Sequence, residues 1–237
     1  MANYVLVHGA WHGGWCWRRV AERLRAAGHR VHVPTLTGLG ERAHLISPQV
    51  GLSTHVEDVL GVLACEGLHD VILCGHSYGG MVITGVADQI PERLAALVYL
   101  DALVPEDGQS AFDVLQPERA EAFRQGAEAH GDGWRVPPVP ARHFGVTDPA
   151  DEAWVNGTCV AMAIKAFEEP LRLTGRYREV ARRSYVLAGA YNPSTFQGIH
   201  ARLKGDPSWR CHVLPTGHDA MVTMPGELTE LLLAEAQ

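Results

Sequence analysis

Short apolar runs alternate with longer segments of helical periodicity along most of this 237-residue chain. The apolar runs have the length of buried strands. They lie at residues 3–8, 29–34, 70–75, 94–102, 184–190 and 209–215. Helical patterns occupy residues 15–28, 53–67, 79–91 and 226–237. Strands joined by helical crossovers predict an α/β fold, in which one mostly parallel six-stranded sheet is covered by helices on both faces.

This alternation stops between residues 105 and 183, where Pro, Gly, Glu and Arg become more frequent. Helical pieces are expected around 118–130 and 151–169, and the loop-like stretch "GDGWRVPPVPARHFG" lies between them. We interpret residues 105–183 as a mainly helical cap inserted over one end of the sheet. Residues 1–104 and 184–237 then form the core domain.

The composition excludes several classes of function. A net charge of −7 and a pI near 6.0 argue against binding to nucleic acid or to an anionic membrane surface. No stretch approaches the roughly 20 apolar residues of a membrane span, and the start "MANYVLVHGAWHGG" lacks the basic region of a signal peptide. The five cysteines are scattered and never spaced C-x-x-C, which favours buried thiols in a reducing, cytoplasmic compartment.

Neither a metal nor an organic cofactor is expected. The chain has thirteen histidines, but none is in H-E-x-x-H spacing. The stretch "GLGERA" at 38–43 fits a dinucleotide-binding fingerprint. It follows the second predicted strand, however, and no long amphipathic helix comes after it, so we interpret it as a loop near the mouth of a site.

The stretch "VILCGHSYGG" places a serine between glycines at the point where a strand stops and a helix begins. Gly75, Ser77 and Gly79 fit G-x-S-x-G in the strand–turn–helix context that this motif requires. A serine at such a bend is held in a strained backbone conformation above the sheet, and the helix N-terminus favours a developing negative charge there. Ser77 is therefore the predicted nucleophile.

A serine hydroxyl needs a base, and two N–H donors must stabilise the oxyanion. In this chain order the base is a late histidine, and His218 in "LPTGHDAM" follows the last predicted strand. One oxyanion donor is the N–H of Tyr78, the residue after Ser77. The other is expected in the loop after the first strand, "HGAWHGGW", where we assign the N–H of Ala10.

The segments "VLVHGAWHGGWCW", "CGHSYGGM" and "GHDAM" occur in this order. With them the chain resembles the α/β-hydrolase superfamily, and within it the small plant methylesterases and hydroxynitrile lyases and their bacterial esterase relatives. The resemblance is strong over residues 3–104 and at the C-terminus, and weak across the insertion. It implies the α/β-hydrolase fold, with Ser77 as nucleophile, His218 as base, and Ala10 and Tyr78 as oxyanion donors.

The acid of the triad departs from the family pattern. Members usually carry an Asp after the penultimate strand, but residues 180–204 contain no carboxylate. Asp101 lies at the tip of the fourth strand, where some α/β-hydrolases place their acid, and it is the preferred candidate. Asn192 as an uncharged orienting group, or no acid at all, are the alternatives.

The reaction expected is hydrolysis of a small to medium apolar or aromatic carboxylic ester through an acyl-enzyme. Hydroxynitrile lyases of this branch have a lysine directly after the histidine, whereas this chain has Asp219, whose charge would repel cyanide. Trp11 and Met221 are the expected substrate contacts. The alternatives are a lyase, a C–C, thioester or polyketide hydrolase with the same triad, or a non-catalytic receptor. A homodimer is a further possibility.

Overall fold

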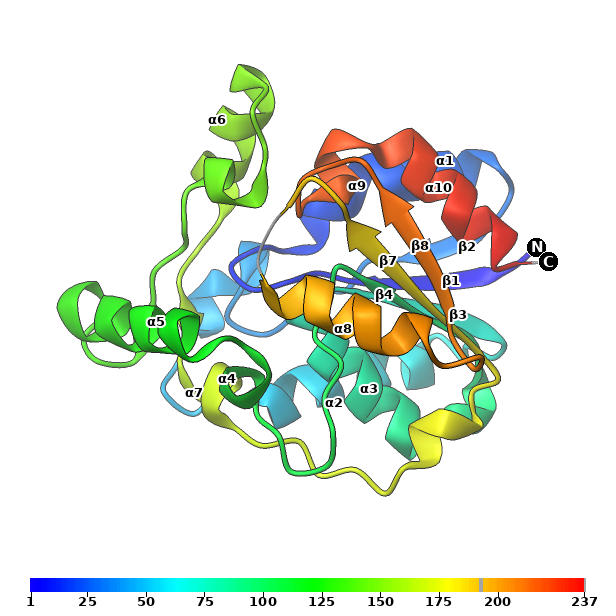
Figure 1. Ribbon diagram of the computed structural model, residues 1–237, viewed down its shortest axis with the longest axis horizontal. Coiled ribbons are helices and arrows are strands. Elements are labelled where there is room, and N and C mark those ends of the chain that lie inside the picture. Colours follow the sequence, from blue (N-terminus) through cyan, green and yellow to red (C-terminus); the bar gives the residue numbers. More distant parts are fainter. Residues whose placement is uncertain (192–193, 237) are drawn as a thin grey trace.

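All six predicted strands pair in one parallel sheet, in the order β2-β1-β3-β4-β7-β8. The computed structural model describes residues 1–191 and 194–236. The strands are β1 (Asn3–Val7), β2 (Arg30–His32), β3 (Val71–His76), β4 (Leu94–Leu100), β7 (Arg182–Ala188) and β8 (Arg210–Leu214). The six-stranded sheet predicted from the sequence is confirmed, and the carboxyl ends of its strands lie at one edge (Figure 1).

Burial decreases from the centre of the sheet to its edge. Every residue of β3 is buried, and so is every residue of β4 except Ala95. In the edge strand β8 only Leu214 is buried. A central parallel strand is covered on both faces and therefore needs apolar residues at every position, which explains the continuous apolar runs in the sequence.

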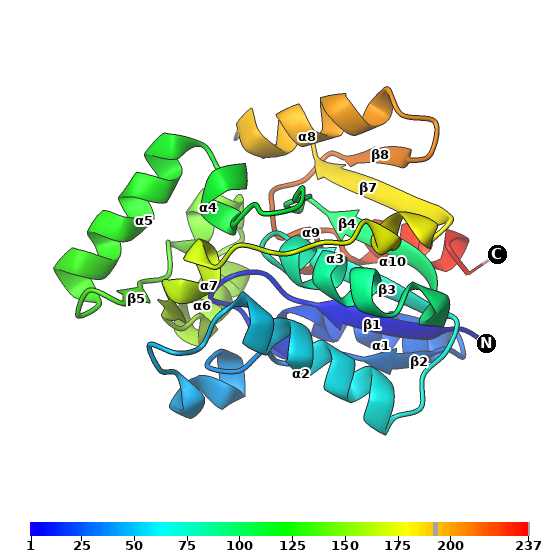
Figure 2. The same ribbon diagram turned by 90° about the horizontal axis from the view of Figure 1, so that it is seen from below.

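Helices cover both faces of the sheet (Figures 1 and 2). The core helices are α1 (Arg18–Ala26), α2 (Leu52–Cys65), α3 (Gly79–Gln89), α8 (Ser194–Lys204), α9 (Ala220–Thr223) and α10 (Pro225–Ala234). α1 packs with α10 on one face, and α2 packs with α3 on the other. Short 3₁₀ helices lie at Gly14–Trp17, Gly40–Leu45, Pro91–Arg93, Ala141–Phe144 and Arg176–Glu179.

Residues 111–168 of the inserted segment lie beyond the carboxyl ends of the strands, whereas the chain after them runs back beside α3 to the start of β7 (Figures 1 and 2). The helices of the inserted segment are α4 (Ala111–Val114), α5 (Pro117–His130), α6 (Pro149–Thr158) and α7 (Lys165–Glu168). The helix expected over 151–169 is interrupted, because the backbone becomes extended at Cys159. The structure also contains a small antiparallel sheet of β5 (Arg135–Val136) and β6 (Met162–Ala163), which the sequence analysis missed. The domain limits at 105 and 183 stay a prediction.

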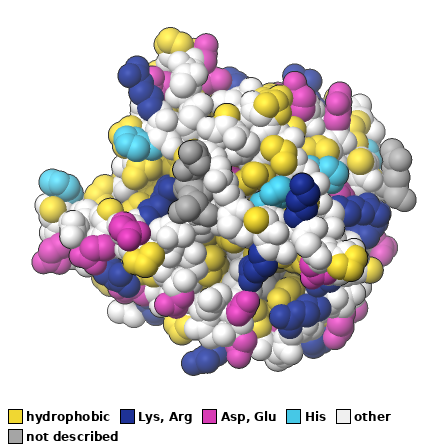
Figure 3. Space-filling view, viewed as in Figure 1, with side chains coloured by type: hydrophobic (Ala, Val, Ile, Leu, Met, Phe, Trp, Pro, Cys, Tyr) yellow, Lys and Arg dark blue, Asp and Glu magenta, His cyan; other side chains and the backbone are white. Residues whose placement is uncertain are grey.

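Among the described residues, no helix is both long and apolar enough to cross a bilayer. On the face shown in Figure 3, acidic and basic side chains are interspersed with apolar ones. The N-terminus and the end of α10 lie together at the side of the molecule opposite the cap (Figure 1). The cap and the carboxyl edge of the sheet therefore enclose the region in which a site is expected.

Candidate active site

Ser77 occupies a sharp bend between β3 and α3. Its φ of +54° is in the left-handed region, which is strained for a residue other than glycine. The Ser77 carbonyl accepts hydrogen bonds from the N–H groups of Gly80 at 3.1 Å and Leu103 at 3.0 Å, which hold the bend in place. A Cβ atom at Gly75 would lie 2.6 Å from the carbonyl oxygen of Gly79, so the first glycine of the motif is required by space.

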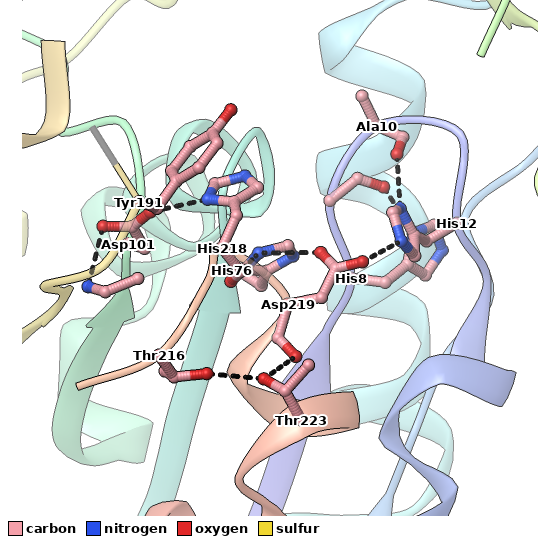
Figure 4. Close-up of polar contacts among 12 residues, drawn as sticks. His8, Ala10, His12, His76, Asp101, Tyr191, Thr216, His218, Asp219 and Thr223 are labelled. Atoms are coloured by element: carbon pink, nitrogen blue, oxygen red, sulfur yellow. Dashed lines mark hydrogen bonds and ion pairs between the residues drawn. The ribbon is translucent and has the colours of Figure 1, made fainter. Parts of the chain in front are cut away.

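His218 and Asp101 form a close buried pair. The Nδ1 of His218 lies 2.6 Å from Oδ2 of Asp101, and the exposed fractions of the two side chains are 2% and 0%. His218 is positioned by its own N–H, which donates to the carbonyl of Phe144 at 2.7 Å. Asp101 follows β4, and its Oδ1 accepts the N–H of Ala188 at the end of β7 at 3.0 Å (Figure 4). The strand tip thus places a carboxylate where the histidine can reach it.

This arrangement suits a neutral imidazole. Burial lowers the pKa of His218 from 6.5 to about 3, although the charge of Asp219 opposes the shift. Burial also raises the pKa of Asp101, and the hydrogen bond from Ala188 acts against that rise. With Nδ1 donating to Asp101, the Nε2 atom of His218 is the acceptor. A hydroxyl that reaches this atom can transfer its proton to it.

A cavity lies beside this pair, and most of the predicted site residues line it. Half of its lining is aromatic. The lining residues are Ala10, Trp11, Ser77, Tyr78, Leu103, Leu115, Arg119, Phe123, Phe144, Phe167, Phe196 and His218. Ser77 and His218, which are 141 positions apart in the sequence, therefore face the same space.

Ala10 and Tyr78, the predicted oxyanion donors, both line this cavity. Within residues 1–191 and 194–236, neither backbone N–H has a hydrogen-bond acceptor. The loop after β1 runs directly against the bend, since a Cβ atom at Gly9 would lie 2.9 Å from the Cβ of Ser77. Two free N–H groups beside the serine have the arrangement that stabilises a developing oxyanion.

The two predicted substrate contacts differ in position. Trp11 lines the cavity, with its indole Nε1–H donating to the carbonyl of Val136 at 3.1 Å. Met221 does not line it, and its side chain is fully buried in the core. The chain turns into α9 directly after His218, which directs the Met221 side chain inward, and a substrate contact of Met221 stays a prediction. Asn192, the alternative orienting group, lies outside the described residues.

Sequence reasoning missed the aromatic residues packed around the base. The ring of Tyr191 stacks on His218 with a centroid separation of 4.5 Å, and the ring of Phe196 lies 5.0 Å away. Both follow β7, the strand whose carboxyl end faces the site. Their position directly after this strand end is the feature of the sequence that could have identified them as site residues.

A second polar cluster lies behind the cavity (Figure 4). The Nε2 of His12 is 3.1 Å from Oδ2 of Asp219, and the Nδ1 of His12 is 2.7 Å from the carbonyl oxygen of Ala10. The Nε2 of His76 is 3.1 Å from the carbonyl oxygen of His218 and 3.7 Å from Oδ1 of Asp219. These three side chains are almost completely buried and belong to segments that carry the oxyanion loop, the serine and the base.

His12 and Asp219 each stabilise the charged form of the other. Burial acts to lower the pKa of His12, but the Asp219 carboxylate and, after it, Cys159 act in the opposite direction and hold that pKa well above 6.5. Burial acts to raise the pKa of Asp219, but the charge of His12 keeps it below its ordinary value. Asp219 is thus the anion of a buried ion pair and is not among the cavity residues, so the argument that it repels cyanide loses its basis. Among the described residues, no group of three or more His, Cys, Asp or Glu side chains is arranged to hold a metal ion.

Comparisons with known proteins show the family of this chain. The family model "Alpha/beta hydrolase family" matches residues 4–231. The carbendazim hydrolyzing esterase of Nocardioides sp. (strain SG-4G) is 50% identical over 242 residues, which cover 99% of each chain. Methyl jasmonate esterase 1 of Vitis vinifera is 32% identical over 249 residues, which cover 97% of this chain and 95% of that protein.

A solved structure supports the same assignment. It is an extracellular alpha/beta-hydrolase from a Paenibacillus species, described as sharing structural and functional homology with tobacco Salicylic Acid Binding Protein 2. It superposes with a TM-score of 0.86 at 27% identity and covers 99% of both chains. Because the family model spans nearly the whole sequence and an esterase relative is half identical over its full length, the protein is a hydrolase of the esterase type and belongs to the alpha/beta hydrolase family.

Proposed function

We propose that this protein hydrolyses small to medium apolar or aromatic carboxylic esters through a covalent acyl-enzyme on Ser77. The observation that carries this proposal is the shared cavity of Ser77 and His218, in which His218 Nδ1 lies 2.6 Å from the Asp101 carboxylate. The cavity thus contains a nucleophile beside a base whose far nitrogen is already oriented.

The reaction proceeds in two proton-balanced halves. In the first, Ser77 Oγ bonds to the acyl carbon, its proton passes to His218 Nε2, and the N–H groups of Ala10 and Tyr78 hold the oxyanion. The bond to the alcohol then breaks, and His218 returns the proton to the leaving oxygen. In the second half, water attacks the acyl carbon and gives a proton to His218, which returns it to Ser77 Oγ as the acid departs.

Asp101 acts on this reaction through His218. Its Oδ2 accepts the Nδ1–H and so fixes the tautomer that leaves Nε2 as the acceptor, while Oδ1 is held by the N–H of Ala188. When Nε2 takes the serine proton, the carboxylate stabilises the imidazolium that results. These contacts support Asp101 over Asn192 and over the absence of an acid.

The lining of the cavity supports the substrate class. Six of its twelve lining residues are aromatic, and such a lining suits an apolar or aromatic ester. The names of two relatives supply probes to test: carbendazim, which the Nocardioides protein is named for hydrolysing, and methyl jasmonate, from the grape enzyme.

The first test is hydrolysis of p-nitrophenyl acetate near pH 8 by the wild type and by Ser77→Ala. We expect the variant to lose roughly 10³-fold or more in kcat, because removing a nucleophile leaves only binding and the oxyanion donors. Ser53→Ala is the control, since Ser53 is exposed, its hydroxyl bonds Glu169, and neither residue lines the cavity. Labelling of the wild type by a fluorophosphonate at Ser77 is expected, and full activity of Ser77→Ala would overturn the proposal.

We also propose a reducing compartment for this protein. The five cysteines are free, which supports the reducing, cytoplasmic compartment expected from their spacing. The homodimer, and the absence of nucleic-acid and membrane partners, stay predictions from the sequence.

A further inference from the structure

Arg119 brings a positive charge to the wall of the aromatic cavity. It lies on α5 in the cap, is half-buried, and lines the same cavity as Ser77 and His218. Among the described lining residues it is the one with a permanent charge, because His218 is held neutral by burial. The mechanism proposed above makes no use of it.

The guanidinium of Arg119 is held in place by aromatic side chains. One of its terminal nitrogens donates to the hydroxyl of Tyr191 at 2.9 Å, and its Cζ lies 5.8 Å from the ring centroid of Phe123 and 6.0 Å from that of Tyr191. Tyr191 in turn stacks on His218. The cation is therefore fixed one residue away from the base, with little conformational entropy left to lose when it binds a ligand.

The charge of Arg119 acts to lower the pKa of the buried Asp101 carboxyl, but the two side chains do not form an ion pair in the described chain. Within residues 1–191 and 194–236, Arg119 makes no ion pair, and the Tyr191 hydroxyl is the acceptor for one of its five N–H donors. Arg124 on the same helix differs, since its Nε lies 3.8 Å from a Glu168 carboxylate oxygen. The remaining donors of Arg119 are available to a ligand in a cavity whose aromatic walls strengthen charge–charge attraction.

We infer that Arg119 binds a carboxylate on the substrate, so that the preferred substrates are aromatic esters that also carry a carboxylate group. A guanidinium presents a planar fork that matches the two oxygens of a carboxylate, and such pairs are stronger than neutral hydrogen bonds. The ester carbonyl lies at Ser77 and the carboxylate at Arg119, with the ring between the aromatic walls. This inference rests on the proposed ester hydrolysis, whose substrate class it narrows.

Binding to the Ser77→Ala protein tests this inference without turnover. Calorimetry compares monomethyl isophthalate with methyl 3-methylbenzoate, and 3-acetoxybenzoate with 3-methylphenyl acetate. Each pair differs by a carboxylate in place of a methyl group, on the acyl side in the first pair and on the alcohol side in the second. We expect the charged member of at least one pair to bind about tenfold or more tightly, a preference that Arg119→Met removes.

Three further variants complete the design in the same Ser77→Ala background. Arg124→Met is the matched control and should keep the preference, because Arg124 does not line the cavity. Arg119→Lys should keep part of it, and Tyr191→Phe should reduce it about threefold by releasing the guanidinium while keeping the ring. These milder variants keep the test valid where Arg119→Met does not fold.

Equal binding within both pairs, or a preference that survives Arg119→Met, would overturn the inference. Either result leaves the proposed hydrolysis standing, since that proposal is judged separately by the turnover of p-nitrophenyl acetate and its dependence on Ser77. Conversely, loss of the preference in Arg119→Met supports the carboxylate site whatever the rate of hydrolysis.

Discussion

Two histidine–aspartate pairs lie buried within this site, and they differ in the second nitrogen of the histidine. His218 contacts Asp101 at 2.6 Å through Nδ1, and its Nε2 is left for the cavity. His12 contacts Asp219 at 3.1 Å through Nε2, and its Nδ1 is occupied by the carbonyl of Ala10. The first histidine has a free position for a proton, whereas the second has none.

Their protonation states follow from this difference. His12 contacts a carbonyl oxygen through one ring nitrogen and a carboxylate through the other. Both contacts need an N–H donor, so His12 is stable as an imidazolium and its pKa is raised. Burial keeps His218 neutral, because it lowers the pKa. A short histidine–carboxylate contact therefore does not by itself identify a base. The hydrogen bonds of the other ring nitrogen decide between a proton acceptor and a structural ion pair.

The largest expected effect is that of Asp101→Asn. The amide can donate to Nδ1, which favours the tautomer with a proton on Nε2, and that tautomer cannot accept from the serine. We expect kcat for p-nitrophenyl acetate to fall on the order of 10³- to 10⁴-fold with little change in the folded structure. Asp219→Asn is the comparison and should retain far more activity. Full activity of Asp101→Asn would show that His218 needs no carboxylate at this position.

The next effect is on stability. Asp219→Asn removes the anion from a fully buried pair and leaves His12 without its counter-charge, which should cost about 3 kcal/mol in the free energy of unfolding near pH 7. Urea unfolding measures this cost. Asp151→Asn is the control, because the Arg19–Asp151 pair is partly exposed and should lose less than about 1 kcal/mol. Equal losses in the two variants would remove the case for a structural ion pair at His12.

The third effect is the pH dependence of that stability. The folded-state pKa of His12 lies above its unfolded value of 6.5, so its contribution is complete below that pH. Above it, the native state binds one more proton than the unfolded state, and stability should fall by up to about 1.4 kcal/mol per pH unit. Asp219→Asn should remove the part of this slope that comes from His12, whereas the part from Asp101, whose pKa burial also raises, should remain. Urea unfolding between about pH 6.5 and pH 8.5 checks it, and a slope of the same size in the variant would assign it to another group.

Sequence patterns predicted the features that depend on local structure. Continuous apolar runs located the sheet, and the crowding of Gly75 against Gly79 is local to one bend, so Ser77 was recognisable. Asp101 could be proposed because it lies at a strand tip where the resemblance to the α/β-hydrolases implies an acid. The pair of His12 and Asp219 could not be predicted, since 207 positions separate the partners and neither lies in a motif that names the other.

Side-chain direction is a second limit on prediction from sequence. Met221 and Asp219 both follow His218 closely, yet both side chains are buried and neither lines the cavity. Arg119 and Tyr191 were missed because their contact joins the cap to the loop after β7, and no periodicity in either segment indicates it. The two-residue strands β5 and β6 are too short to show alternation. The features that the sequence did not reveal are those that depend on tertiary packing.

The smallest expected effect is a shift to lower pH of the point at which kcat/KM begins to fall in acid. The kcat/KM of a serine esterase falls at low pH as its free base becomes protonated. Because burial lowers the pKa of His218, the neutral imidazole persists below 6.5, and we expect activity near pH 5.5 to stay within about twofold of its value near pH 7. A base with an ordinary pKa of 6.5 would already have lost most of its activity there. Circular dichroism at each pH separates this limb from unfolding, which acid favours because the pKa of His8 is also lowered by burial, to about 3. A midpoint at or above 6.5 in folded protein would mean that His218 is stabilised as an imidazolium, and the distinction from His12 would then fail.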